Sequence, residues 1–367
     1  MKKENRIVMT LDAGGTNFVF SAYQDLKGIV EPISVPVKGM ALQPLLKAVI
    51  TQFRHIETLL PEPPVAISFG FPGPCDYPAG IVGDLENLPC FRGGVALGPM
   101  LEDEFKIPVF INNDADLFAY GESIKGLLPA INREFEKAGS PKRYYNLFGV
   151  TLGTGFGGGI VSHNQLAWGD NAVSGEINRI TNKLYPDYSV EESVSIKGVR
   201  RVYAREAGIA FDELPEPKDI YEIAIGEREG NKTAALRAFD ELAIVLAQSL
   251  TDSITLIDGI VAIGGGLANA SKLFLPKVLE ELRKPYKTPS GNQFSRLELE
   301  VFNLDDEKER AEFIKGDVRE ITVPFNDRKI LYDAQKRVGI GRAVMRTHEA
   351  SSVGAYVFAL NKLDGKR

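Results

Sequence analysis

The chain has 367 residues, of which 44% are hydrophobic and 25% charged. This is enough for two ordinary domains and excludes a disordered or fibrous protein. The formal net charge of -6 argues against a nucleic-acid binder, because such proteins usually carry an excess of basic residues. Two cysteines, Cys75 and Cys90, exclude a disulfide framework or a cysteine-rich zinc site. Glycine departs from the average, with 36 residues, so its distribution along the chain decides what it means.

No segment of the sequence is typical of a membrane span or a signal peptide. The first apolar run, Ile7–Leu11, is far too short for either. The richest later stretch, residues 254–267, is interrupted by Asp258 and by four glycines. We therefore expect a cytoplasmic protein without a membrane partner.

Strand-like and helix-like segments alternate along the chain, which indicates an α/β protein. Met40–Leu60 and Lys232–Leu250 have helical periodicity, and Ser352–Leu363 is apolar enough for a C-terminal helix that packs back on the first domain. Short apolar runs bounded by Gly, Pro or Asn predict strands at Ile7–Leu11, Phe18–Tyr23, Val65–Phe69, Val109–Ile111, Leu147–Leu152, Gly159–Val161 and Gly259–Ile263.

A weak internal repeat predicts two domains of similar plan. Residues 10–15 and residues 151–155 each join two apolar runs through a glycine-rich turn. We expect a small domain of residues 1–115 plus 350–367 and a large domain of residues 116–349. Two stretches of the large domain, near 211–231 and 284–323, have the composition of surface insertions.

The glycines concentrate at the ends of three predicted strands. Glycine there allows backbone N–H groups to converge on a phosphate without Cβ atoms in the way. A tight turn alone explains any single cluster about equally well, whereas three such clusters favour a phosphate site. The clusters are residues 14–16 after Asp12, residues 149–159, and residues 264–266.

Two familiar phosphate motifs do not apply. The chain has no P-loop string. Residues 153–158 match the dinucleotide string Gly-x-Gly-x-x-Gly, but a Rossmann fingerprint opens a helix, and here Gly159–Val161 continues as a strand. A dinucleotide site is therefore disfavoured.

Carboxylates follow the predicted strand at Val109–Ile111. Asp114 lies where a strand ends and a helix begins, which is where ligand sites open in α/β sheets. It is a candidate to accept a proton from a substrate hydroxyl, and a helix N-cap is the alternative. Further along, Glu176 and Glu191 follow the large glycine cluster. They are candidates to accept hydrogen bonds from sugar hydroxyls, with solvated surface as the alternative.

Taken together, these motifs resemble the ROK family of sugar kinases, within the sugar kinase/Hsp70/actin superfamily. The matching segments occur in the family's order over most of the chain: residues 11–17, 70–76, 86–89, 113–116 with 121–122, 152–159 and 263–266. Each string alone is weak, but six in the right order are specific. The resemblance implies a two-domain actin-like ATPase (ribonuclease H-like) fold with a cleft between the domains.

The resemblance also implies roles for single residues. Asp114 would be the general base on the attacking hydroxyl, commonly the 6-hydroxyl of a hexose or N-acetylhexosamine, and Asp12 would act near Mg²⁺ through water. The sugar would contact Pro72, Gly73, Asn87, Asn113, Glu176 and Glu191. ATP would contact Asp12, Gly14, Gly15, Thr16, Asn17, Gly153, Thr154, Gly155, Gly264, Gly265 and Gly266. Alignment and charge neutralisation by metal and backbone donors fit phosphoryl transfer. A homodimer is a further implication.

One segment departs from the family pattern. Arg179 stands where the family usually has a histidine, and residues 185–191 contain none of the cysteines of its zinc motif. Since structural zinc needs about four Cys or His ligands, we predict no zinc site. Arg179 either donates to a sugar oxygen or replaces the histidine only structurally, and the assignment of Glu191 depends on an ungapped alignment through this segment.

Three other functions are alternatives to a sugar kinase. The family's DNA-binding repressors carry a segment ahead of the first phosphate motif, and only eleven residues precede Asp12 here, so a repressor is not expected. An actin-like or chaperone-type ATPase is disfavoured by Asn113-Asp114 and the Pro72-Gly73 loop. A catalytically silent sugar or nucleotide sensor is the main alternative. The presence of Asp114 and of both phosphate loops argues against it.

Overall fold

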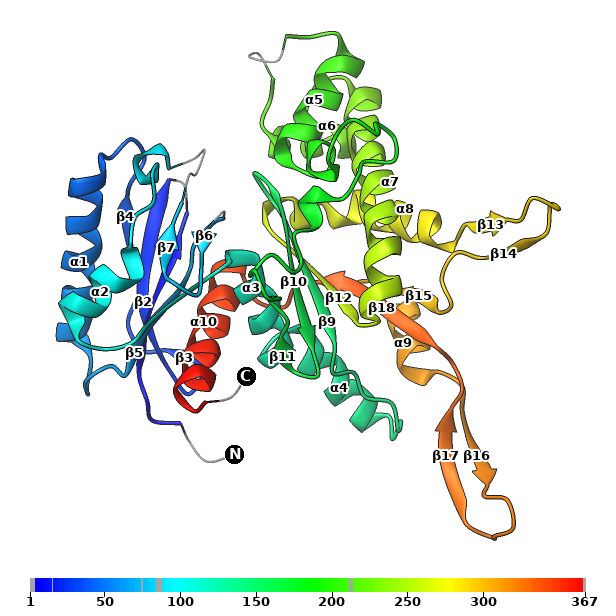
Figure 1. The fold of residues 1–367 in the computed structure, drawn as a ribbon. Coiled ribbons are helices and arrows are strands. Elements are labelled where there is room, and N and C mark those ends of the chain that lie inside the picture. Colours follow the sequence, from blue (N-terminus) through cyan, green and yellow to red (C-terminus); the bar gives the residue numbers. More distant parts are fainter. Residues whose placement is uncertain (1–3, 15, 74, 84–87, 211–213, 366–367) are drawn as a thin grey trace. The chain divides into compact units, whose positions relative to one another are not determined.

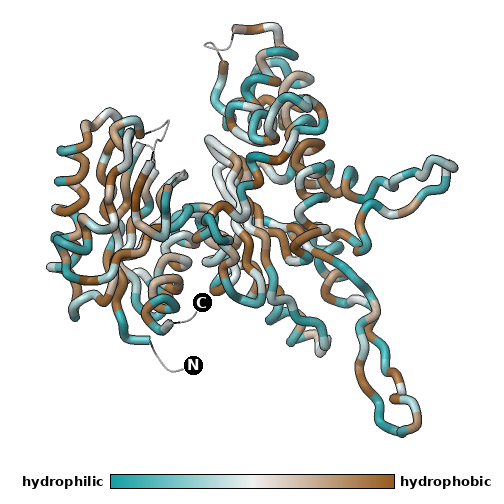
Figure 2. Tube along the Cα trace, in the orientation of Figure 1, coloured by the Kyte–Doolittle hydropathy of each residue, from teal (hydrophilic) through white to brown (hydrophobic). Residues whose placement is uncertain are grey.

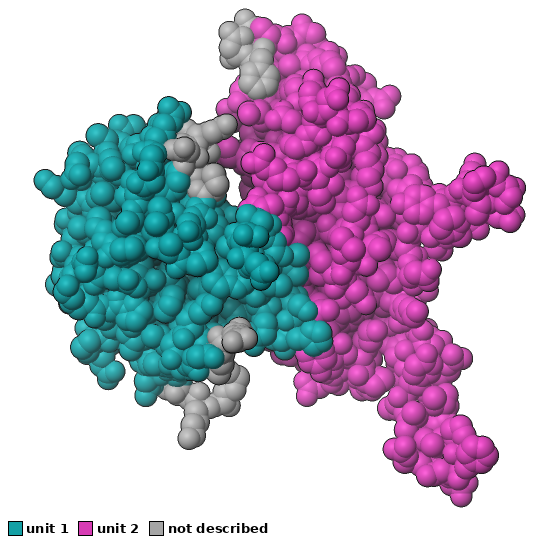
Figure 3. Space-filling view, viewed as in Figure 1, with its two compact units in different colours: residues 1–126, 159–174, 345–367 teal, residues 127–158, 175–344 magenta. Residues whose placement is uncertain are grey.

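The computed structural model describes residues 4–14, 16–73, 75–83, 88–210 and 214–365. They divide into two compact units (Figure 3). Unit 1 contains residues 1–126, 159–174 and 345–367, and unit 2 contains residues 127–158 and 175–344. Contacts thus place residues 116–126, 159–174 and 345–349 in unit 1, whereas the sequence assigns all three ranges to the large domain. The limits of the evolutionary domains remain a prediction.

Unit 1 is built on a mixed sheet (Figure 1). The strand order is β3-β2-β1-β5-β8, with β4 also paired to β2. β1 and β2 form an antiparallel hairpin, while β1, β5 and β8 run parallel. The strands are β1 (Val8–Ala13), β2 (Asn17–Gln24), β3 (Lys27–Gly28), β4 (Ile33–Pro36), β5 (Ala66–Gly70) and β8 (Val109–Asn112), and the small β6 (Cys75–Asp76) and β7 (Ile81–Val82) pair with each other.

Side chains alternate between the two faces of this sheet, as the strand period of two requires. Met9, Ile67 and Ile111 belong to one core cluster, with α1 (Leu42–Leu59) and α2 (Leu97–Phe105). Val8 and Ala66 belong to a second cluster, with α10 (Thr347–Leu363). The helices therefore cover both faces, and the strand ends stay open for a site.

Helices α3 (Asp114–Ile124) and α10 cross through glycines. A Cβ on Gly121 would lie 1.9 Å from the backbone oxygen of Ala350, and one on Gly354 would lie 2.0 Å from that of Leu117. Only glycine allows the two backbones this close. The crossing explains why α3 belongs to unit 1, and it fixes the helix that begins at Asp114.

We predict that Gly354→Val destabilises the protein by about 1–3 kcal/mol or more, because the added carbons force the helices apart. Urea unfolding measures the loss. Gly28→Val is the matched control, since the nearest atom that a Cβ there meets is Tyr23 Cζ at 3.8 Å, an ordinary van der Waals contact. Equal losses in both variants would show that the close crossing contributes nothing.

Unit 2 is built on a second sheet with the strand order β10-β9-β12-β18-β15. β9, β12, β18 and β15 run parallel. Their bounds are β9 (Leu147–Leu152), β12 (Ile260–Gly264), β18 (Arg337–Arg342) and β15 (Glu300–Asn303). β10 (Phe156–Ser162) begins in unit 2 and ends in unit 1, where it pairs with β11 (Gln165–Leu166). The helices of unit 2 are α4 (Leu127–Lys137), α5 (Ile196–Ala207), α6 (Pro217–Ile225), α7 (Lys232–Ile257), α8 (Ser271–Arg283) and α9 (Glu307–Lys315).

The predicted strands and helices are confirmed, with shifted ends. The C-terminal helix begins at Thr347, five residues before the predicted start, and α7 continues to Ile257. Of the stretches expected as surface insertions, residues 211–213 lie outside the described part. The second stretch holds more than surface: β15 pairs with β18 in the sheet, and Phe313 of α9 is fully buried.

Two hairpins extend from unit 2 (Figures 1 and 2). They are β13 (Pro285–Lys287) with β14 (Gln293–Ser295), and β16 (Val318–Thr322) with β17 (Lys329–Asp333). At the tip of the second, the N–H of Asn326 donates to the carbonyl oxygen of Val323, and Phe325 is fully exposed at a φ of +60°. A bulky side chain is disfavoured in that left-handed conformation.

Phe325→Gly is therefore expected to raise the free energy of unfolding by about 0.5–1 kcal/mol, because glycine adopts this φ without strain and no buried contact is lost. Thermal unfolding measures the change. A loss of stability instead would show that the Phe325 side chain packs against something in solution.

Candidate functional site

Three parallel strands of unit 1 end in one row. The register aligns Asp12 of β1 with Gly70 of β5, and Gly70 with Asn112 of β8. Since carboxyl ends of parallel strands are where ligands bind in α/β sheets, this edge is the candidate site of unit 1. Asp12 lies in this row, the Pro72-Gly73 loop comes after β5, and Asp114 comes after β8.

Asp114 is the first residue of α3. A Cβ on Gly70 would lie 3.0 Å from its Cα, so the end of β5 supports its backbone directly. From α10, the Ser351 hydroxyl donates to the Asp114 carbonyl oxygen at 3.3 Å. The N-cap alternative for Asp114 is wrong, because Asn113 caps α3 by accepting from the N–H groups of Ala115 and Asp116.

The surroundings of the Asp114 carboxyl favour its protonated form. Its side chain reaches solvent, yet the loss of surrounding water raises the pKa of Asp114, which the N–H of Ala115 partly offsets. A carboxylate with a raised pKa is a stronger base than an ordinary aspartate.

Asp12 is the second acid of this edge. Burial raises the pKa of Asp12, the negative charge of Asp114 raises it further, and His348 at the start of α10 lowers it. The two carboxylates therefore lie within electrostatic range of each other. Such a pair favours a cation nearby, because a positive charge relieves both the burial and the repulsion.

Asn113 is tied to the Pro72-Gly73 loop through Tyr77. The Asn113 side-chain Nδ2 donates to the Tyr77 hydroxyl at 3.3 Å, and that hydroxyl donates to the Phe71 carbonyl oxygen at 3.0 Å. A Cβ on Gly73 would lie 3.0 Å from the same hydroxyl. The structure thus brings Pro72, Gly73 and Asn113 together, and it adds Tyr77, which no sequence motif indicated.

The turn between β1 and β2 carries the first glycine motif. The N–H of Gly14 donates to the Asn17 carbonyl oxygen at 3.1 Å, and Thr16 and Asn17 expose their side chains. The turn is therefore accessible to a ligand, as the motif predicts. Gly15 and Asn87, two of the predicted contact residues, lie outside the described residues.

The second glycine motif lies in unit 2, between β9 and β10. The N–H of Gly153 donates to the Gly155 carbonyl oxygen at 2.9 Å, and Thr154 is exposed. The chain continues from this turn as strand β10, so it does not open a helix as a dinucleotide fingerprint does. The strand predicted after this turn, on which the case against a Rossmann site rests, is confirmed.

Glu191 contacts this turn directly. Its Oε2 accepts from the N–H of Phe156 at 2.8 Å, and a Cβ on Gly155 would lie 2.7 Å from the same oxygen. One Glu191 oxygen is thus held by the backbone of the second phosphate motif. The solvated-surface alternative for Glu191 is excluded by this hydrogen bond.

The third glycine motif lies beside the second. β12 ends at Gly264, which the register aligns with Thr151 of β9. Gly265 has a φ of +86°, and a Cβ there would lie 2.3 Å from the Leu152 carbonyl oxygen. Gly266 then begins a 3-10 turn, Gly266–Ala270. The two motifs therefore form one glycine-lined edge of the unit 2 sheet.

Glu176 follows a residue that packs against β10. It precedes the 3-10 turn Ile177–Arg179, and a Cβ on Gly158 would lie 2.5 Å from the Gly175 carbonyl oxygen. Glu176 is half-buried and Arg179 exposed. The segment from Glu176 to Glu191 is closed by the backbone pairing of Thr181 with Ser189, so both acids belong to one folded segment of unit 2.

The candidate residues thus form two groups, one on each unit. Asp12, Gly14, Thr16, Asn17, Pro72, Gly73, Asn113 and Asp114 gather in unit 1, and Gly153, Thr154, Gly155, Glu176, Glu191, Gly264, Gly265 and Gly266 in unit 2. Sequence motifs missed Tyr77, Ser351 and His348, because each acts through a contact with a residue far away in the chain.

Metal and membrane features are sparse in the described part of the chain. Its residues contain no group of three or more His, Cys, Asp or Glu side chains that could hold a metal ion, and the absence of zinc remains a prediction. No helix of the described residues has the length and hydropathy to cross a membrane.

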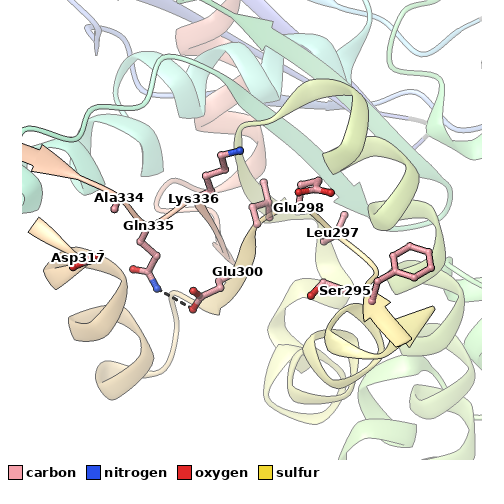
Figure 4. A pocket seen from close by; sticks show the side chains of 11 residues that line it. Ser295, Leu297, Glu298, Glu300, Asp317, Ala334, Gln335 and Lys336 are labelled. Atoms are coloured by element: carbon pink, nitrogen blue, oxygen red, sulfur yellow. Dashed lines mark hydrogen bonds between the residues drawn. The ribbon is translucent and has the colours of Figure 1, made fainter. Parts of the chain in front are cut away.

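A hollow of about 610 Å³ lies near the two hairpins of unit 2 (Figure 4). Its rim includes Glu298, Glu300, Asp317 and Lys336, and Gln335 donates to Glu300 within it. None of the candidate residues named above lines it. The hollow is therefore separate from both groups.

Known proteins resemble this chain along most of its length. The model of the ROK family matches residues 8–301. A crystal structure of a glucokinase from Parabacteroides distasonis superposes with a TM-score of 0.87 at 51% identity, covering 98% of this chain and 99% of that one. A glucokinase from Halalkalibacterium halodurans is 27% identical over 246 residues, 61% of this chain and 68% of its own. An N-acetyl-D-glucosamine kinase from Vibrio cholerae is 27% identical over 285 residues, 72% of this chain and 87% of its own.

Proposed function

The chain belongs to the ROK family, and we propose that it is an ATP-dependent sugar kinase. It transfers the γ-phosphate of ATP to the 6-hydroxyl of a hexose or an N-acetylhexosamine. The α/β fold expected from the motifs is confirmed by the sheets and by the likeness to the glucokinase structure. The kinase names of the relatives support the reaction class.

The observation that carries the proposal is the placement of Asp114. A carboxylate with a raised pKa follows a parallel strand, next to the Asn113–Tyr77–Gly73 contacts. There it can accept the proton of a sugar hydroxyl as that oxygen attacks phosphorus. Pro72, Gly73 and the Asn113 amide are proposed to orient the sugar, and the Ser351 hydrogen bond to hold Asp114 in place.

In unit 2, the glycine-lined edge is proposed to take the phosphates and adenosine of ATP. The Gly153–Gly155 turn offers backbone donors and the exposed Thr154 hydroxyl, which suits phosphate oxygens. The Gly264–Gly266 turn lies beside it. Glu176 and Glu191 are proposed to accept hydrogen bonds from sugar hydroxyls, Glu191 with the oxygen that Phe156 leaves open.

Asp12 is proposed to act near Mg²⁺. Magnesium is commonly held by one or two carboxylates together with substrate phosphates, and the raised pKa of Asp12 beside Asp114 marks a place where positive charge is favoured. When bound, Mg²⁺ neutralises the charge that spreads over the transferred phosphoryl group. A homodimer and a cytoplasmic location stay predictions.

A coupled ADP-release assay with glucose, fructose, mannose, N-acetylglucosamine and N-acetylmannosamine tests the proposal. We expect one sugar to raise the rate well above the background without sugar. If no sugar raises ADP release while calorimetry shows a sugar or ATP binding, the silent-sensor alternative is correct and the kinase proposal is wrong.

A further inference from the structure

A buried carboxylate of α7 lies under the segment that joins Glu176 to Glu191. Glu241 is 7% exposed. Its Oε1 accepts from the Ser193 hydroxyl at 3.1 Å, and its Oε2 accepts from the Tyr185 hydroxyl at 3.0 Å and from Arg205 Nη2 at 3.0 Å. Both oxygens are therefore engaged, by groups that come from separate parts of unit 2.

Asn182 completes this arrangement. Its side chain is fully buried, and its Nδ2 donates to the Ser193 hydroxyl at 3.0 Å. Its Oδ1 accepts from the N–H groups of Leu184 and Tyr185, at 3.0 and 3.2 Å. Asn182, Tyr185, Ser193, Arg205 and Glu241 are called the Glu241 cluster below. The cluster joins the middle of the segment, and Ser193 just beyond its end, to the long helix α7.

The Glu241 position is one where packing alone favours an apolar residue. Its neighbours Ala238, Leu242 and Val245 are buried on α7. A buried charge adds little net stability even when it is paired, whereas removing its partners is costly. A satisfied polar network does fix one arrangement of the groups around it. What the cluster contributes is thus the position of the segment.

That position reaches the second phosphate motif through Glu191. Glu191 stands two residues before Ser193, within the 3-10 turn Val190–Glu192. The N–H of Ser193 donates to the Val190 carbonyl oxygen at 3.0 Å, so the turn that carries Glu191 is continuous with the cluster. Glu191 in turn accepts from the N–H of Phe156 at 2.8 Å. A displacement of Ser193 therefore displaces the Glu191 carboxylate against Gly155.

We propose that Glu241 and Ser193 are positioning residues: their cluster holds Glu191 against the Gly153–Phe156 turn in the orientation that binds sugar. The proposal rests on the proposed function, since it concerns how that site is held. Glu241 touches neither sugar nor ATP, and it acts only through Ser193 and the turn of Glu191.

The chain offers a matched control on the same helix and the same segment. Asp252 of α7 pairs with Lys183 at 2.8 Å, with both side chains more than 40% exposed. Asp252→Asn removes the same charge from α7 and the same kind of link to the segment, but it leaves the cluster intact. An effect of Glu241→Gln that Asp252→Asn lacks is therefore specific to the cluster.

Steady-state kinetics with the sugar found in the ADP-release assay give the first test. We expect Glu241→Gln and Ser193→Ala to raise the KM for sugar about tenfold, with a much smaller change in kcat. Ser193→Thr keeps the hydroxyl and is expected to restore a KM close to that of the parent. In a Glu191→Gln background, Glu241→Gln should add nothing further.

Hydrogen exchange gives a test that needs no activity. The Phe156 amide is expected to exchange faster in Glu241→Gln and Ser193→Ala than in the parent or in Asp252→Asn, by more than the measured loss of global stability in each variant explains. The proposal is overturned if Phe156 exchange is unchanged in the folded variants, or if Glu241→Gln raises the KM equally with and without Glu191. Faster Phe156 exchange in these variants, together with a parent that phosphorylates no sugar, would keep the positioning role and reject the kinase function.

Discussion

Asp114→Asn should lower kcat by about 10²–10⁴-fold, because the amide cannot accept the proton of the attacking hydroxyl. The fold should be unchanged, since the asparagine oxygen can still accept from the N–H of Ala115, which now bonds Asp114 Oδ1 at 3.0 Å. The KM for sugar should change far less than kcat. The measurement is sugar-dependent ADP release under saturating ATP and Mg²⁺.

Asp103→Asn is the control for this variant. Asp103 is an exposed aspartate of α2 in the same unit, and the substitution should leave kcat unchanged. Full activity in Asp114→Asn would refute Asp114 as the general base, because the hydroxyl proton would then leave without help from the Asp114 carboxylate.

The pH dependence follows from the same carboxyl. The loss of surrounding water raises the pKa of Asp114 above the ordinary 3.8, and the base acts only when it is deprotonated. The rate should therefore fall as the pH drops through the raised pKa, at a higher pH than for an exposed aspartate. The residual activity of Asp114→Asn should lack this acid limb.

Arg337→Ala should have the largest effect on stability, a loss of about 3–5 kcal/mol, because it leaves a buried carboxylate without its partner. The Arg337 side chain is fully buried, and it holds Asp333 at 2.7 and 2.9 Å. Its Nε donates to the Phe313 carbonyl oxygen at 2.6 Å, and the guanidinium lies 5.5 Å from the ring centres of Phe135 and Phe313. Urea unfolding measures the loss.

Two further variants separate the charge from the packing. Arg319→Ala, in the exposed hairpin, should change stability by less than about 0.5 kcal/mol. The double variant Arg337→Met with Asp333→Leu should lose less than Arg337→Ala, because the pair is replaced by apolar groups. A larger loss in the double variant would show that the ion pair itself stabilises the fold.

Asp333 also gives this pair a pH signature. Burial alone would raise the pKa of Asp333, but the hydrogen bonds and charge of Arg337 outweigh it and lower the pKa below 3.8. A lowered folded-state pKa contributes stability above the unfolded-state value, and that stability is lost as the pH falls through the folded-state pKa. Arg337→Ala should therefore remove part of the acid sensitivity of unfolding below about pH 4.

Local sequence patterns predicted most of the fold. Apolar runs that end in Gly, Asn or Asp place β1, β8, β9 and β12, because buried parallel strands must end where polar groups regain solvent or ligands. The same patterns fail for β15, which lies within charge-rich residues 284–323. Only its Val301 and Phe302 are buried, too short a run to separate a strand from a loop.

The candidate site was predicted as far as motifs extend. Asp12, Asp114 and the glycine turns each carry their own local signal, since a ligand site needs particular residues at the end of each strand. Tyr77 and Ser351 carry none, because their roles arise from hydrogen bonds to Asn113 and Asp114 across 36 and 237 positions of the chain. The Glu241 cluster is hidden for the same reason: one glutamate within an apolar helix has no pattern of its own.

The structure explains how residues 179–191, which depart from the family pattern, are ordered without its zinc ligands. In place of cysteine ligands, this segment has Asn182, Tyr185 and, just beyond it, Ser193, all bonded within the Glu241 cluster. Residue types with weak individual signals thus order the segment together. A motif search finds what is missing there but cannot find the network that is present.

The most direct test of the central claim is the product formed from ATP, Mg²⁺ and the active sugar. Phosphorus NMR of the reaction mixture should show a sugar phosphomonoester at the 6-position, formed in equal amount to ADP. Formation of ADP with inorganic phosphate and no sugar phosphate would contradict the account, because the protein would then be an ATPase and not a sugar kinase.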